Sequence, residues 1–135
     1  MQTALTEGEL VAGVLLPKLG PGSGWAFCEL ARRSGDFAVV AVCAVVELDG
    51  RGRCLRAAVA VAGVGPRAVE TLLAGSVLNP GLLLEAASEA TALVQPSDDV
   101  FASAEYRRAM TGVMVRRALA LAAKKAGHDL EGTSL

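Results

Sequence analysis

The hydrophobic and polar positions in the first half of the chain follow the two-residue period of β-strands. Residues 25–33 alternate between two faces, and residues 37–48 are apolar on both faces, which predicts a central strand covered on both sides. The sequence Asp-Gly-Arg-Gly at 49–52 predicts a hairpin turn, because glycine tolerates a positive φ, and a return strand over residues 53–62 follows it. A shorter apolar segment, residues 10–16, precedes these strands.

The second half carries the start and stop signals of helices. Pro66 suits the first position of a short helix and Gly75 suits its end. Asn79 followed by Pro80 predicts the capped beginning of a second helix, which extends to about Leu93.

A long last helix is predicted between Ser103, its cap, and Gly127, a plausible C′ residue. Arg107 and Arg108 are expected to lie on its outer face and to pair with nearby carboxylates. The carboxylates in reach are Asp98, Asp99 and Glu105. The residues whose helical spacing predicts contact with the core are Tyr106, Met110, Val113, Met114 and Leu121.

Strands followed by helices predict an α+β fold, in which an antiparallel three- to four-stranded sheet is followed by three helices packed on one face. We expect a single domain over residues 1–135, with 1–17 as a boundary segment and 128–135 as a loose tail. Helices on one side leave the apolar central strand open on the other. The pattern therefore also predicts a homo-oligomer or another subunit on that face.

Composition excludes several classes of partner and site. A net charge of −1 with dispersed Arg and Lys argues against nucleic acid. No secretory signal opens the chain, and its longest apolar run is about half of what spans a bilayer, so neither a membrane nor export is expected. Cys28, Cys43 and Cys54 lack zinc-site spacing, which indicates small buried hydrophobes in a reducing cytoplasm and no metal site.

Residues 26–38, AFCELARRSGDFA, are similar to the stretch that opens the C-terminal domain of carbon monoxide dehydrogenase flavoprotein subunits. Three further motifs agree with that family in order and spacing. They are GVGP at 63–66, PSDDVFASAEYRR ending at residue 108, and VRRAL at 115–119. Residues 3–17 also resemble the segment that precedes this domain in the family.

The resemblance implies a place in molybdenum hydroxylases. Their flavoprotein subunits carry electrons through FAD between an iron–sulfur subunit and an external acceptor, while a molybdenum subunit hydroxylates the substrate. The FAD sits mainly in an N-terminal domain with two Gly-rich loops on the pyrophosphate. The C-terminal domain closes over the isoalloxazine ring and helps the subunits to dock.

The chain departs from that family at two points. Its glycine cluster at residues 20–24 lies between strands rather than opening a helix, so it offers no helix N-terminus to phosphate. Glu29 stands where many members have Lys, and a carboxylate there would repel the anionic N1–C2=O edge of a flavin. We therefore expect no cofactor on this chain alone, and FAD only with a separate FAD domain.

Five residues are candidates for a site around the first strand. Trp25 and Phe27 form either a platform for a flat small-molecule ligand or a patch buried against a partner chain. Glu29 and Arg33 share their face and are either solvated or free to meet a ligand. Asp36 is either an acid or base, or a turn residue that caps backbone N–H groups.

Two functions follow. The first is a stand-alone docking or flavin-covering module of a molybdenum-hydroxylase flavoprotein subunit, with oxidoreductase subunits as its partners. The alternative is a cofactor-free cyclase or isomerase that uses the flavin-covering face as a pocket. In that enzyme Glu29 and Asp36 would move protons and Arg33 would stabilise an oxyanion. His128, alone in the expected tail, cannot complete a catalytic triad.

Overall fold

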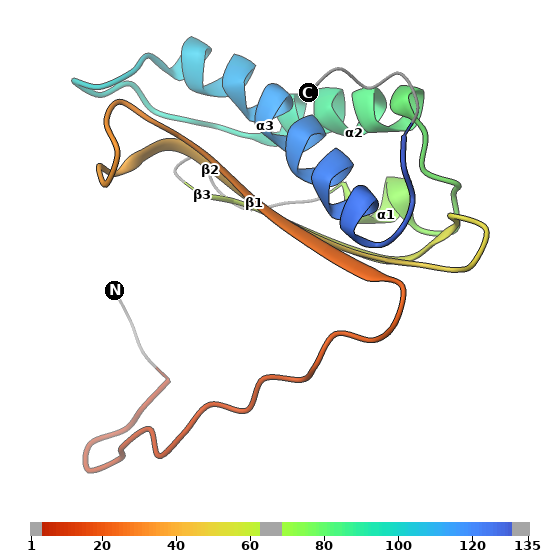
Figure 1. Ribbon diagram of the computed structural model, residues 1–135. Coiled ribbons are helices and arrows are strands. Elements are labelled where there is room, and N and C mark those ends of the chain that lie inside the picture. The colour runs from red at the N-terminus through yellow and green to blue at the C-terminus, as the bar shows by residue number, and fades with distance from the viewer. Residues whose placement is uncertain (1–3, 63–68, 131–135) are drawn as a thin grey trace.

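A computed structural model describes residues 4–62 and 69–130. Three antiparallel strands form a sheet in the order β1-β2-β3, and three helices lie on one face of it (Figure 1). The strands are β1 (Ser23–Ala31), β2 (Ala38–Leu48) and β3 (Cys54–Ala62), and the helices are α1 (Glu70–Leu73), α2 (Pro80–Leu93) and α3 (Ala104–Lys125). The α+β prediction and the order of its elements are confirmed.

Helix ends follow the capping residues. The Asn79 side chain accepts a hydrogen bond from the Leu82 N–H, and the Ser103 hydroxyl accepts one from the Tyr106 N–H. Gly127, with φ of 89°, donates its N–H to the Lys124 carbonyl, while the His128 N–H bonds to Ala123, as in a Schellman motif. The Pro66 start predicted for the first helix lies outside the described residues, and α1 is a single turn.

The core between β1 and α3 is thin because small side chains build it there. Ala26 and Cys28 of β1 and Ala118 and Ala122 of α3 are all buried. Gly24 marks the closest approach, since a Cβ built on it would lie only 1.9 Å from the Ala122 carbonyl oxygen. The backbones of β1 and α3 therefore meet where any side chain would keep them apart.

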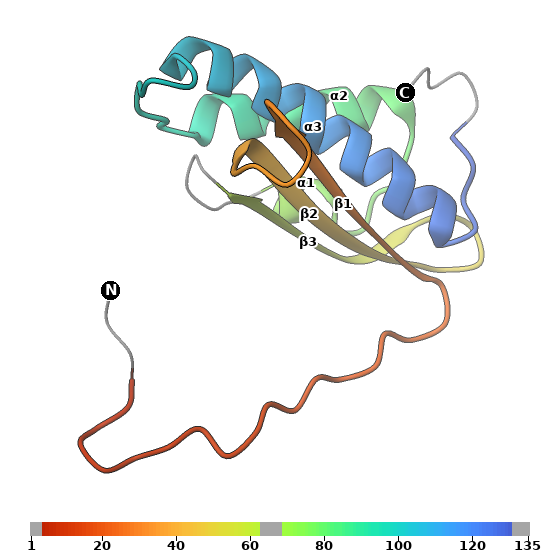
Figure 2. The ribbon, with the colours of Figure 1, turned by 60° about the vertical axis from the view of Figure 1, so that its left-hand side comes forward.

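An extended arm, residues 4–19, leaves the start of β1 and runs away from the sheet on the side opposite the helices (Figures 1 and 2). The apolar residues 10–16 belong to this arm and form no strand, and Leu10 and Leu15 are 89% and 94% exposed. Phe37 is likewise outside the strand in which it was expected, and β2 begins at the next residue. Residues 4–19 thus form an exposed apolar arm.

The cysteine prediction is confirmed at two positions and wrong at one. Cys28 and Cys54 are buried, and desolvation raises the pKa of both thiols. Cys43 is exposed, because its position in β2 points it away from the helices.

The buried stripe of α3 begins with an arginine. Arg107 is only 6% exposed, whereas Tyr106, predicted to face the core, is 48% exposed. The Arg107 guanidinium donates to the Val39 carbonyl at 2.7 Å and pairs with Asp99. The expected pairing with a nearby carboxylate is therefore confirmed, and the expected outer position is wrong. A hydrophobicity pattern places Arg outside, but the bonds from its two terminal nitrogens to Val39 and Asp99 let the side chain bury, while its Nε–H has no partner among the described residues.

The expected loose tail begins with two packed residues. The His128 ring nitrogen Nε2 lies 2.8 Å from the Leu78 carbonyl oxygen, and Leu130 is 9% exposed. The ring also covers Gly52, where a Cβ would lie 2.5 Å from it. His128 therefore packs against the hairpin turn, and Leu130 is buried.

Replacing Gly24 by alanine should destabilise the protein by at least about 2 kcal/mol, because the new methyl group would force β1 and α3 apart. The free energy of unfolding from urea titration measures the effect. Gly50→Ala is the matched control, since a Cβ there meets nothing within 4 Å. Equal stability of the two variants would contradict the close approach.

Arg107→Ala should destabilise the protein by more than about 2 kcal/mol, whereas exposed Arg108→Ala should cost at most about 0.5 kcal/mol. The hydrogen bond from Arg107, followed by those from Phe101 and Ala102, holds the Asp99 pKa below its ordinary 3.8. The ion pair thus stabilises the fold above about pH 4. It is lost as pH falls through the lowered pKa, so the cost of Arg107→Ala should shrink in acid. Thermal unfolding of both variants from pH 7 to pH 2.5 measures this, and a cost that does not depend on pH would contradict it.

Candidate functional site

The outer face of the sheet, opposite the helices, is an apolar surface that the helices leave uncovered. Its three central rows run across the strands in register: Trp25–Val45–Ala58, Phe27–Cys43–Ala60 and Glu29–Ala41–Ala62. Only Glu29 is charged in these nine positions. Apart from the two aromatic rings and Glu29 the side chains are small. At the Val45–Ala58 row the face and residues 17–20 line a hollow of about 240 Å3.

Trp25 and Phe27 are half exposed on neighbouring rows, at 52% and 57%. The Lys125 ammonium nitrogen lies 3.7 Å from the centre of the Trp25 ring, so the end of α3 covers one face of the indole. What stays open to a flat partner is the rest of the Trp25 ring and the Phe27 ring. Trp25 and Phe27 are exposed on the same face of the sheet, as predicted. That they bind a ligand stays a prediction.

The three charged candidates do not share one place. Glu29 lies in the third row of the outer face. Arg33 comes after the end of β1, so strand parity does not place it with Glu29. Asp36 accepts a hydrogen bond from the Phe37 N–H at 2.8 Å, which is the turn-capping contact, and lines a separate pocket that neither of the other two lines. Their catalytic roles remain predictions.

That separate pocket, which we call the end pocket, lies where the β1–β2 connection meets the segment before α3. Its volume is about 320 Å3. It is lined by Arg32, Asp36, Phe37, Ala38, Val39, Ser97, Asp99, Phe101 and Arg107. No pattern in the sequence indicated that these two segments meet, although both belong to motifs that carried the family resemblance.

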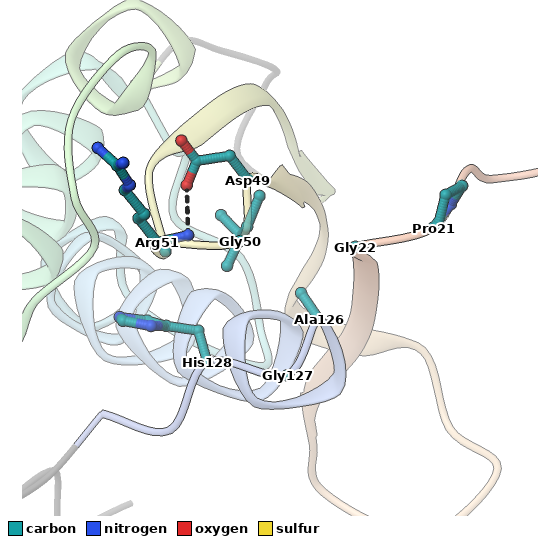
Figure 3. A pocket seen from close by; sticks show the side chains of 10 residues that line it. Pro21, Gly22, Asp49, Gly50, Arg51, Ala126, Gly127 and His128 are labelled. Carbon is teal, nitrogen blue, oxygen red and sulfur yellow. Dashed lines mark hydrogen bonds between the residues drawn. The ribbon is translucent and has the colours of Figure 1, made fainter.

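A second hollow, about 630 Å3, lies at the other end of the sheet between the hairpin turn and the end of α3 (Figure 3). Asp49 and Arg51 come from the turn and His128 from the residues after the helix. Asp49 accepts hydrogen bonds from the backbone N–H groups of Arg51 and Arg53, which lower its pKa. These groups are engaged in holding the turn and the chain end, which favours a structural role.

Phosphate finds no cradle among the described residues. At the start of α2 the Leu82 N–H bonds to Asn79, and at the start of α3 the Ala104 and Tyr106 N–H groups bond to Asp98 and Ser103. A Cβ on Gly22 would lie 2.5 Å from the Leu48 carbonyl, and Gly24 is closed by α3, so this glycine cluster serves packing. Within residues 4–62 and 69–130 no group of three potential metal ligands occurs. No described helix has the length and apolarity to cross a membrane.

Comparison with known proteins gives a consistent result. The family model described as CO dehydrogenase flavoprotein C-terminal domain matches residues 25–122. The 6-hydroxypseudooxynicotine dehydrogenase complex subunit alpha of Paenarthrobacter nicotinovorans is 37% identical over 129 residues, which are 92% of this chain and 44% of that protein. The carbon monoxide dehydrogenase medium chain of Hydrogenophaga pseudoflava is 34% identical, over 87% of this chain and 42% of its own length.

Solved structures agree. Carbon monoxide dehydrogenase from Hydrogenophaga pseudoflava superposes with a TM-score of 0.74 at 30% identity, over 82% of this chain and 40% of the other. Quinoline 2-oxidoreductase from Pseudomonas putida 86 superposes with a TM-score of 0.69 at 32% identity, over 78% of this chain and 39% of the other. The chain thus spans less than half the length of these relatives.

Proposed function

Because this chain belongs to the CO dehydrogenase flavoprotein C-terminal domain family, we propose that it is the docking and flavin-covering module of a molybdenum-hydroxylase flavoprotein subunit. Its partners are then an FAD-binding domain and the other oxidoreductase subunits. The relatives' names, as a complex subunit and a medium chain, support partners of this kind.

The observation that carries the proposal is the outer face. It is apolar in eight of its nine central positions and left open by helices that all lie on the other side (Figure 2). Burying apolar surface is worth roughly 25 cal/mol per Å2, so covering a few hundred Å2 would supply several kcal/mol. The exposed apolar arm leaves the sheet on the same side. A domain seated against the outer face would therefore also come within reach of the arm.

A flavin fits this chain only in part. The open surfaces of Trp25 and Phe27 suit the flat isoalloxazine ring, which supplies the two-electron chemistry when it is bound. Among residues 4–62 and 69–130, the capped helix ends and the closed glycine cluster offer no cradle to the pyrophosphate. Glu29 adds a carboxylate beside the ring surface. The proposal therefore assigns the pyrophosphate to the FAD-binding domain and only one side of the ring to this chain.

The isolated chain should be colourless and should bind FAD no more tightly than about millimolar, roughly 4 kcal/mol of binding free energy. Trp25 is the only tryptophan and lies on the outer face, so its fluorescence follows the titration. Riboflavin, which lacks the pyrophosphate, should bind about as well as FAD. Recovery of a yellow protein with stoichiometric FAD would refute the assignment of the pyrophosphate to another domain.

Without a covering domain, two copies of the chain should associate through the outer face. Phe27→Ser should then shift the chain from dimer or larger toward monomer in light scattering. Leu84→Ser on α2 is the matched control, since Leu84 is 61% exposed and Phe27 57%. A wild-type monomer at 200 μM, or equal effects of the two substitutions, would count against the outer face as a docking surface.

A further inference from the structure

The end pocket is a second place where the protein offers a surface to a partner, apart from the outer face. None of Trp25, Phe27 and Glu29 lines it. Its volume of about 320 Å3 is at the small end of the range of ligand sites, which suits a single-ring molecule.

Two aromatic rings at the end pocket are exposed. Phe37 is 96% exposed and Phe101 is 57% exposed, and the Arg32 guanidinium carbon lies 5.6 Å from the centre of the Phe101 ring. An aromatic ligand placed against these groups would remove two phenyl rings from water, and a guanidinium also stacks well on a ring. The lining thus favours a planar ring over an aliphatic chain.

The charges at the end pocket form one fixed pair and one pair still available to a ligand. Arg107 and Asp99 bond to each other, and Asp99 also accepts the N–H groups of Phe101 and Ala102, so both are engaged within the fold. Arg32 and Asp36 are exposed and carry opposite charges. One Asp36 oxygen accepts the Phe37 N–H, and its carboxylate retains acceptor capacity.

We propose that the end pocket binds a small neutral aromatic amide. The ring lies against Phe37 and Phe101, the amide oxygen accepts from Arg32, and the amide N–H donates to Asp36. A carboxylate on the same ring would meet Arg32 favourably but would be repelled by Asp36. An ammonium group would have the opposite difficulty. The neutral amide alone presents an acceptor and a donor side by side.

Three probes of nearly equal size separate these cases: benzamide, benzoate and benzylammonium. Each is titrated into the 15N-labelled full chain at pH 7, and backbone amide shifts report both the affinity and the place of binding. We expect benzamide to bind about tenfold more tightly than either charged probe, as one hydrogen bond to a charged group allows. The largest shifts should occur at residues 36–39 and 99–101.

Charge variants make the test specific to the end pocket. Asp36→Asn keeps an oxygen for the Phe37 N–H and removes the negative charge. The affinity for benzoate should therefore rise about tenfold relative to the affinity for benzamide. Arg32→Gln should lower the affinity for benzamide about tenfold. Arg33 is an exposed neighbour that does not line the pocket, so Arg33→Gln should leave this affinity unchanged.

Equal affinity of the three probes, no binding of benzamide at 20 mM, or largest shifts on the outer face would each overturn the proposal. The proposal would also be overturned if the Asp36→Asn variant folds normally and binds the three probes in the same order of affinity as the wild type. None of these outcomes bears on docking through the outer face, which is read from association in the absence of any probe.

Discussion

The contact between Gly24 and the end of α3 is the constraint on which the arrangement of the molecule depends. At this point the strand and the helix touch backbone to backbone, because the strand has no side chain and the helix offers alanine. This contact fixes the last turns of α3 on the start of β1, and the bond from Arg107 to Val39 at the other end of the helix sets its direction across the sheet. With this direction, Lys125 lies over Trp25.

Much of this architecture was predictable because it depends on signals from residues that are close together in the sequence. The alternation of β1 separates Trp25 and Phe27 from Cys28, and single capping residues define the beginnings of α2 and α3. These features depend on residues two or three positions apart in the chain, which is the range over which a pattern is read directly.

Most of the features that the sequence did not reveal join distant segments. Arg107 is buried because Val39, 68 positions away, accepts its hydrogen bond, and His128 is held by a carbonyl 50 positions away. The end pocket exists only because residues 32–39 and 97–107 meet. The exposure of Cys43 was missed for a different reason, since an apolar strand without polar alternation does not say which side the helices will cover. Tertiary partners, rather than local preference, decide each of these cases.

Cys43 gives the outer face a chemical marker of its own. The other two thiols are buried, with raised pKa values that keep them protonated and slow to react, whereas Cys43 is exposed between Phe27 and Ala60. An alkylating reagent such as iodoacetamide should therefore modify this position first. Its rate measures how much of the time the face is uncovered. The same thiol makes the uncovered chain sensitive to oxidants, because two faces that meet can be joined by a disulfide, whereas a face seated on its proper neighbour is shielded.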